Sequence, residues 1–159
     1  MLIKSNLFFL VIIFVIAAVA CQKNNCPDTK TALINQFNQF VNTTLRTKQY
    51  YSIKEWETKD KEFTEYLQVC YPPLDTSMYL DERQKFWSDA LRYYFKRYDE
   101  RVTFELLNNK NSNSKILQNQ IKSTWANPDV AFQQIFQEMT GLKFDDAVNA
   151  VRDSTLPNQ

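Results

Sequence analysis

The sequence has no histidine, and its 159 residues include only one glycine and three cysteines. Without histidine the chain cannot form a Ser-His-Asp triad, a Cys-His pair or a His-ligated metal site. The single glycine, Gly141, excludes the phosphate-binding loops, which need several glycines so that the backbone can approach a phosphate. Three cysteines are too few for a four-thiolate zinc site. We therefore expect no metal ion and no cofactor.

An excess of charge is also missing, because 19 basic and 18 acidic residues give a formal net charge of +1. Proteins that bind nucleic acid present a strongly basic face, so this balance argues against a nucleic acid partner. The acid–base pairs that remain are carboxylates, which glycoside hydrolases use. The candidates are Glu62, Glu65, Glu138, Asp145 and Asp146, and no distinctive motif surrounds them. We expect a protein that is not an enzyme.

One long apolar run is present, over residues 7–20. Its fourteen residues are fewer than the roughly twenty that a membrane-spanning helix needs, and they match the core of a signal peptide. Lys4 precedes the run, and the small residues Ala17, Ala18 and Ala20 end it. This layout is typical of a secretory signal.

The residues Ala18-Val19-Ala20-Cys21 resemble the lipobox of bacterial lipoproteins, in which a small residue precedes an obligatory cysteine. That resemblance implies cleavage before Cys21, diacylglycerylation of its thiol and usually acylation of the new amino terminus. Several acyl chains anchor a protein stably, since each buried methylene contributes about 0.8 kcal/mol. The alternative is an ordinary signal peptide whose cleavage leaves Cys21 as a plain thiol. Bacterial lipoproteins prefer leucine three residues before the lipidated cysteine, where this chain has Ala18.

The chain is thereby divided into a lipoprotein signal peptide over 1–20, a lipidated cysteine with its tether over 21–28, and a single all-helical domain over 29–159. We expect the outer membrane of a bacterial envelope as the location of the anchor. In some bacterial lipoproteins, a basic residue and two acids after the lipidated cysteine act as a tag for export to the cell surface. This chain has the amides Asn24 and Asn25 in place of the acids, so the sequence leaves both the periplasmic and the surface face of the outer membrane open.

If Cys21 carries lipid, Cys26 and Cys70 remain as an even pair in an oxidising compartment, which is typical of a disulfide. A bridge would close a loop of about 44 residues and contribute on the order of 4 kcal/mol. The alternative is a free Cys26 in the tether and a Cys70 packed as a small apolar side chain.

Apolar residues recur at helical spacing beyond the tether, and no segment has the alternation of a strand. We expect an all-α bundle of four to six helices. The helix over 81–107 has aromatic residues on several faces, so we expect it at the centre. The predicted helices are 28–45 with Asp28 as N-cap, 52–70 with a Ser52–Glu55 capping box, 81–107, 115–125, 127–140 ending at Gly141, and 145–152, with a polar loop over 108–114.

The apolar face of the second predicted helix is interrupted by Asp60, one turn after Trp56. A carboxylate on a core-facing side needs a partner, because burying it alone is costly. Asp60 is therefore either a binding-site acid or a structural residue paired with a tyrosine hydroxyl or an arginine of the 81–107 helix.

Basic and aromatic residues alternate in the middle of the 81–107 helix, over residues 92–98. Arg92, Tyr93 and Arg97 could stack on or pair with a glycan or protein partner. The alternative is a core stripe beside a solvated charged face.

The segment from Tyr50 to about Leu107 resembles a family of small bacterial lipoproteins that is filed as a domain of unknown function. The similar residues are Ser52, Trp56, Asp60 and Phe63 in the first helix, followed by Trp87 and the tyrosine-rich stretch 94–98. The resemblance implies a helical envelope lipoprotein and supplies no catalytic residues.

Together these features predict a lipid-anchored, non-enzymatic envelope protein that binds a protein or a glycan. The candidate binding residues are Trp56, Asp60, Arg92, Tyr93 and Arg97. A structural or stress-related envelope protein without a dedicated ligand is the alternative, and a carboxylate-dependent glycan hydrolase is a third hypothesis.

Overall fold

The computed structural model describes residues 26–107, 111–141 and 143, and this part of the chain contains helices and no strand. The all-α prediction is confirmed. Five helices have at least 13 residues, and the short α4 and α6 bring the total in the described residues to seven. The helices are α2 Lys30–Thr47, α3 Ile53–Glu65, α4 Pro72–Asp75, α5 Leu80–Tyr98, α6 Val102–Leu107, α7 Ser112–Thr124 and α8 Pro128–Thr140. None of the described helices has the length and apolar character needed to cross a membrane.

Several predictions lie outside the described residues. These are the signal peptide over 1–20, the lipidation of Cys21 and the helix over 145–152.

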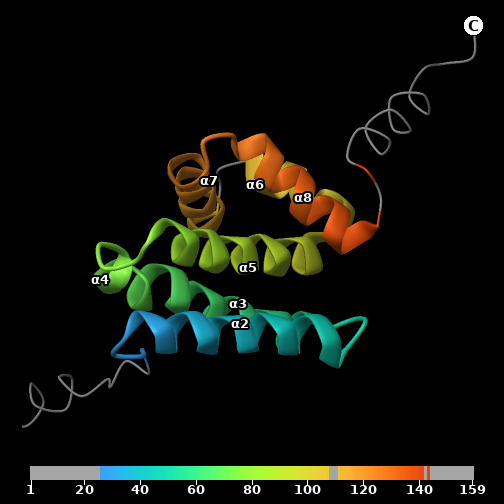
Figure 1. Cartoon of the computed structure of the whole chain (residues 1–159). Helices are drawn as coiled ribbons and strands as arrows, with labels where there is room; N and C mark the ends of the chain where they lie inside the picture. The colour runs from blue at the N-terminus through green and yellow to red at the C-terminus, as the bar shows by residue number, and fades with distance from the viewer. Residues whose placement is uncertain (1–25, 108–110, 142, 144–159) are drawn as a thin grey trace, which may run out of the picture.

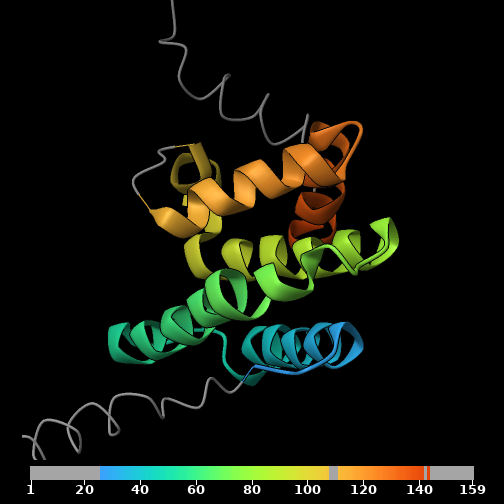
Figure 2. The same cartoon turned by 90° about the vertical axis from the view of Figure 1, so that its left-hand side faces the viewer.

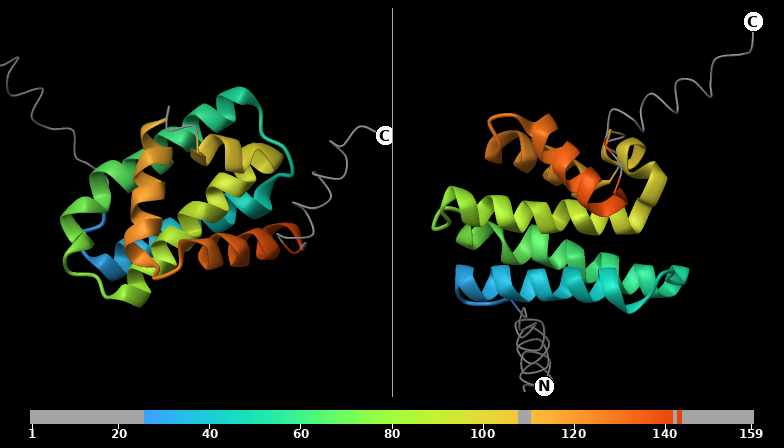
Figure 3. Two further views of the ribbon diagram at one scale, coloured as in Figure 1. Left: turned by 90° about the horizontal axis from the view of Figure 1, so that it is seen from above. Right: turned by 45° about the vertical axis from the view of Figure 1, so that its right-hand side comes forward.

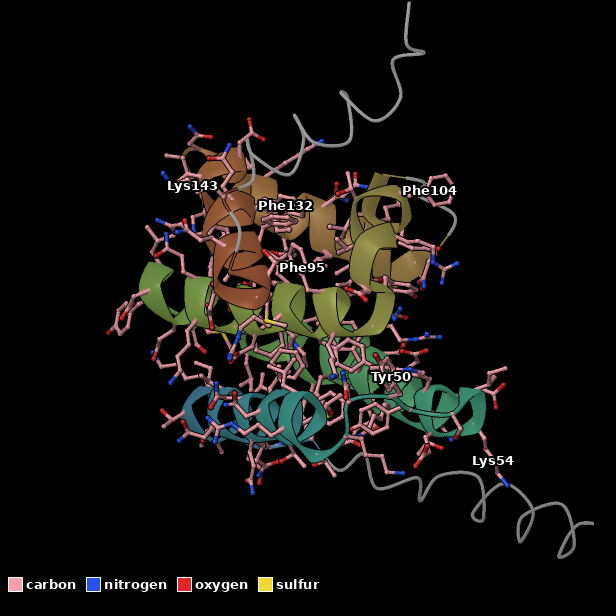
Figure 4. The ribbon with its side chains drawn as sticks, turned by 90° about the vertical axis from the view of Figure 1, so that its right-hand side faces the viewer. Tyr50, Lys54, Phe95, Phe104, Phe132 and Lys143 are labelled. Carbon is pink, nitrogen blue, oxygen red and sulfur yellow. A yellow bond between two sulfur atoms is a disulfide. The ribbon has the colours of Figure 1, made fainter. Side chains whose placement is uncertain are left out.

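Helix α5 lies at the centre, with α2 and α3 on one side and α6, α7 and α8 on the other (Figures 1, 2 and 3). It buries aromatic side chains toward both sides, as its sequence predicts. Tyr93 stacks on Phe63 of α3 with ring centres 4.1 Å apart, and Phe86 stacks on Phe37 of α2 at 4.3 Å. On the other side Phe95 meets Phe132 of α8 at 5.3 Å (Figure 4).

Three of the four predicted capping residues, Ser52, Asn127 and Gly141, are confirmed. In the Ser52–Glu55 capping box, the Ser52 backbone N–H donates to Glu55 Oε2 at 2.9 Å and the Glu55 backbone N–H donates to Ser52 Oγ at 3.4 Å. Gly141 ends α8 with a φ of 72°, which glycine adopts without a steric penalty. The prediction of Asp28 as the first N-cap is wrong: Thr29 caps α2, because its Oγ1 accepts from the Ala32 N–H at 3.2 Å.

The predicted continuous helix over 81–107 is wrong. It breaks at Asp99, which has a φ of 49° and is followed by a 3₁₀ turn, Asp99–Arg101 (η2), before α6 begins. The turn lets Val102 and Leu106 of α6 bury their side chains in the core beside α7. The predicted start of the next helix at residue 115 is also wrong. Helix α7 begins at Ser112, and Asn111 caps it.

A π-helical turn, Tyr66–Cys70 (η1), extends α3 to the proline pair that was predicted to end it. The Tyr71 N–H donates to the Tyr66 carbonyl at 2.9 Å, which is the wider hydrogen bond of a π-helix. Cys70, at the end of this turn, forms a disulfide with Cys26. Of the two alternatives for these cysteines, the bridge is the one present.

Candidate functional site

A groove of about 600 Å³ opens at one end of the molecule, and we call it the end groove. It lies where α2 and α5 end and α3 begins, with the last turn of α8 on its far side, and Figure 4 faces this end. Its lining residues are Leu45, Gln49, Tyr50, Tyr51, Trp56, Arg92, Phe95, Lys96, Arg97, Asp99, Glu138, Met139 and Thr140.

The aromatic side of the end groove comes from the connection between α2 and α3. Tyr50 is 81% exposed, whereas Trp56 is only 9% exposed. Tyr51 covers Trp56, with ring centres 4.9 Å apart, and its hydroxyl donates to the Thr44 carbonyl at 2.9 Å. Tyr50 is therefore the aromatic ring of the groove that is most open to a ligand.

Arg97 belongs to a polar cluster behind the aromatic side. Its Nε donates to Asp60 Oδ2 at 3.0 Å, and the Tyr93 hydroxyl donates to Asp60 Oδ1 at 2.7 Å. The Arg97 guanidinium carbon also lies 4.9 Å from the Trp56 ring centre and 5.1 Å from that of Tyr98. Asp60 thus has the tyrosine and arginine partners that the structural interpretation predicts.

A second polar cluster joins α5 to α2 on one side and to α8 on the other. Asp89 is 3% exposed and accepts from Asn38 Nδ2 of α2 at 2.8 Å and from Arg92 Nη1 at 3.0 Å. Arg92 Nε lies 3.1 Å from Glu138 Oε1 of α8, but the N–H is not directed at that oxygen. This contact is therefore an ion pair without hydrogen-bond geometry. Arg92 connects α5 to α8 through these carboxylates.

Lys96 has no carboxylate partner among the described residues, unlike the two arginines of the end groove. Its Nζ donates to the Gln49 carbonyl at 3.1 Å, next to Tyr50. An ammonium group has three N–H donors, so two remain for a ligand. Lys96 is the basic group of the groove that is free to pair with an anion.

The tyrosine hydroxyls near Asp60 stay protonated. Burial raises the pKa of Tyr93 far above its ordinary value of 10, and the hydrogen bond to Asp60 raises it further. Burial, and then the negative charge of Asp60, raise the pKa of Tyr98. Neither hydroxyl can act as a base near neutral pH. No group of three or more His, Cys, Asp or Glu residues that could hold a metal ion occurs in the described part of the chain.

Of the five predicted binding residues, the structure places Trp56, Arg92 and Arg97 in the end groove. Asp60 and Tyr93 line a separate cavity of about 310 Å³ between α3, α5 and the start of α7. The prediction of Tyr93 as a ligand contact is wrong, because its side chain is only 1% exposed. Its ring is part of the core, and its hydroxyl donates a hydrogen bond to Asp60.

The sequence analysis missed four residues: Asn38 and Asp89 of the second polar cluster, and Tyr50 and Lys96 of the end groove. Asn38 and Asp89 interrupt apolar helix faces just as Asp60 does, so the same signal could have identified them. Tyr50 and Lys96 gave no such signal, because one lies in a connection and the other on a mixed face of α5.

No known protein family, curated protein sequence or solved structure matches this chain. The resemblance to small helical lipoproteins therefore stays a prediction, and a functional proposal depends on the geometry above.

Proposed function

We propose that this protein is a lipid-anchored bacterial envelope protein that binds a glycan or a protein through its end groove and is not an enzyme. The observation that supports a binding role is the end groove itself. Its volume of about 600 Å³ falls in the range of ligand sites, roughly 300–1,000 Å³. It combines an exposed aromatic ring, Tyr50, with the ammonium group of Lys96, which bonds the Gln49 carbonyl and has no carboxylate partner among the described residues.

The disulfide supports the anchor, because it fixes the start of the described chain at the opposite end from the groove. Cys26 lies five residues after Cys21, so an extended tether would span at most about 18 Å. Its partner Cys70 closes η1 at the far end of α3 from Trp56. Helix α2, with 18 residues, separates Cys26 from the groove by about 27 Å. A lipid on Cys21 would thus be attached near the end of the bundle that lies opposite the groove.

The arrangement of the acids favours binding over hydrolysis. Two carboxylates line the end groove, and one of them, Glu138, is engaged by Arg92. A glycosidase needs both carboxyl groups directed at the scissile bond. The alternative of a structural protein without a ligand draws on the burial of Tyr93 and Phe95, but it assigns no role to a groove of this volume.

The proposal is tested by co-sedimentation of the purified mature chain carrying Cys21→Ser, which has no acyl chain to insert into a membrane, with the isolated envelope fraction of the cells that make the protein. We expect saturable binding by this unlipidated chain and loss of binding when Tyr50→Ser is added. Phe104→Ser is the matched control, because Phe104 is 64% exposed on α6 and does not line the groove. Absence of binding to every envelope fraction, or an equal loss in both variants, would contradict the proposal.

A further inference from the structure

The charges of the end groove leave room for a single negative group. Arg97 is paired with Asp60, and Arg92 contacts both Asp89 and Glu138. Only Lys96, among the basic groups that line the groove, lacks a carboxylate partner in the described residues. A polyanion such as a nucleic acid needs several free cations, so the groove fits a ligand with one carboxylate at this point.

The exposed ring beside Lys96 adds a second requirement. The Lys96 ammonium contacts the Gln49 carbonyl, and Gln49 Nε2 donates to the Tyr50 hydroxyl at 3.3 Å. Through Gln49 the lysine and the tyrosine thus belong to one surface, and Figure 4 shows Tyr50 between the α2 and α5 layers. An aromatic face packs well against the C–H face of a sugar ring, while the ring's hydroxyl groups remain free for polar partners.

The other lining groups suit a polar ligand better than a peptide. The carboxamide of Gln49 and the carboxylates of Asp99 and Glu138 are on exposed residues. The apolar members Trp56 and Phe95 are 9% and 5% exposed, and Leu45 and Met139 are half-buried, so the groove has no continuous apolar face for an amphipathic helix. Strand addition is also unavailable in the described part of the chain, because it contains no sheet edge.

We propose that the end groove binds an acidic saccharide, with a sugar carboxylate on Lys96 and a ring face on Tyr50. This inference rests on the proposed function and specifies its ligand class. Each contact is separable, since Lys96 supplies the charge and Tyr50 the stacking surface. A neutral sugar of the same shape would keep the second contact and lose the first.

The test is calorimetric titration of the purified full mature chain with methyl galacturonoside, a sugar with one carboxylate, compared with its uncharged methyl ester. We expect Lys96→Gln to weaken binding of the acid about tenfold, as for the loss of a charge-assisted hydrogen bond. The ester should bind the wild type as weakly as the acid binds Lys96→Gln. Tyr50→Ser should weaken both ligands by roughly fivefold. Lys54→Gln and Phe104→Ser are the matched controls, because both positions are exposed outside the groove, and they should bind as the wild type does.

Three results would overturn the inference: equal affinity for acid and ester, an equal effect of Lys96→Gln and Lys54→Gln, or tighter binding of an end-blocked Gly-Glu-Gly peptide, which also has one carboxylate, than of methyl galacturonoside. The last result would assign the groove to an acidic peptide. If the sugars fail while envelope binding still depends on Tyr50, only the ligand class is wrong. If envelope binding fails as well, both the ligand class and the proposed function are wrong.

Discussion

Polar residues placed within apolar helix faces join neighbouring helices of this protein. Asp60 joins α3 to α5 through Tyr93 and Arg97, and Asp89 joins α5 to α2 through Asn38. A buried polar group is costly without a partner, so each such residue indicates a contact that the fold must supply. From the sequence we predicted a partner for Asp60, and the same argument applies to Asp89.

The hydrogen bond between Tyr93 and Asp60 yields a first prediction. Tyr93→Phe removes one hydrogen bond to a carboxylate, but the Asp60 side chain is 33% exposed and can bind water instead. We expect the free energy of unfolding to fall by about 1 kcal/mol, as measured by urea denaturation. Tyr50→Phe is the control, since that hydroxyl is on an exposed side chain, and it should change stability by less than about 0.5 kcal/mol. Equal stability of the two variants would contradict the role given to Asp60.

The capping box of α3 yields a pH-dependent prediction. A hydrogen bond from Lys48, followed by those from Ser52, lowers the pKa of Glu55 from 4.5 to about 2. Because the folded state holds the charged form, the stability that Glu55 contributes is complete above about pH 4.5 and is lost as the pH falls toward 2.

The measurement compares urea unfolding of the wild type and Glu55→Gln at neutral pH and at pH values approaching 2. We expect the wild type to be the more stable at neutral pH and the difference to shrink in acid. Glu57→Gln, on the exposed side of the same helix, should differ little from the wild type at both ends of the range. A difference for Glu55→Gln that is constant with pH would rule out this role for its charge.

At the scale of elements, the best-predicted helix ends are those with a capping residue or a breaker. Ser52 and Asn127 begin helices and Gly141 ends one as expected. The end of α5 was missed, because neither glycine nor proline lies near Asp99 and the apolar periodicity continues through it. Tertiary packing of Val102 and Leu106 against α7 determines this break, and such packing has no local sequence signal.

The backbone conformation of Asp99, at the end of α5, gives a prediction about stability. A non-glycine residue with its φ of 49° and ψ of −126° is strained, which costs about 1–3 kcal/mol. Asp99→Gly removes the strain but adds about 0.5–1 kcal/mol of backbone entropy cost. We expect a net gain of about 1 kcal/mol in stability, read from the midpoint of thermal unfolding. Asp99→Ala retains a Cβ atom and should show no gain, so equal midpoints for the two variants would contradict the strain at Asp99.

At the scale of the whole molecule, the fold separates a disulfide end from a groove end. Cys26 and Cys70 mark the first, and Tyr50 and Lys96 lie at the second. The sequence was sufficient to predict the helical class and the central position of α5. It could not predict the end groove, because the groove combines the ends of four helices whose relative positions depend on the complete packing.

The disulfide should contribute strongly to the stability of the whole molecule. It closes a separation of 44 residues, for which loop closure gives about 4 kcal/mol. We expect the double variant Cys26→Ser and Cys70→Ser to unfold at much lower urea concentration than the wild type under oxidising conditions. A reducing agent should bring the wild type close to the double variant and leave the double variant unchanged. A wild type unaffected by reduction would show that the bridge contributes little to stability.

The proposed lipid anchor at Cys21 would determine the compartment and the accessible partners, so the other functional proposals depend on it. It is tested most directly by the intact mass of the mature amino terminus, taken with cell fractionation of the wild type and Cys21→Ser. We predict a membrane-bound wild type that begins at Cys21 and carries the mass of acyl chains, and a variant that is unprocessed or soluble. A soluble wild type that begins with an unmodified Cys21 would contradict the claim and make this a freely secreted helical protein.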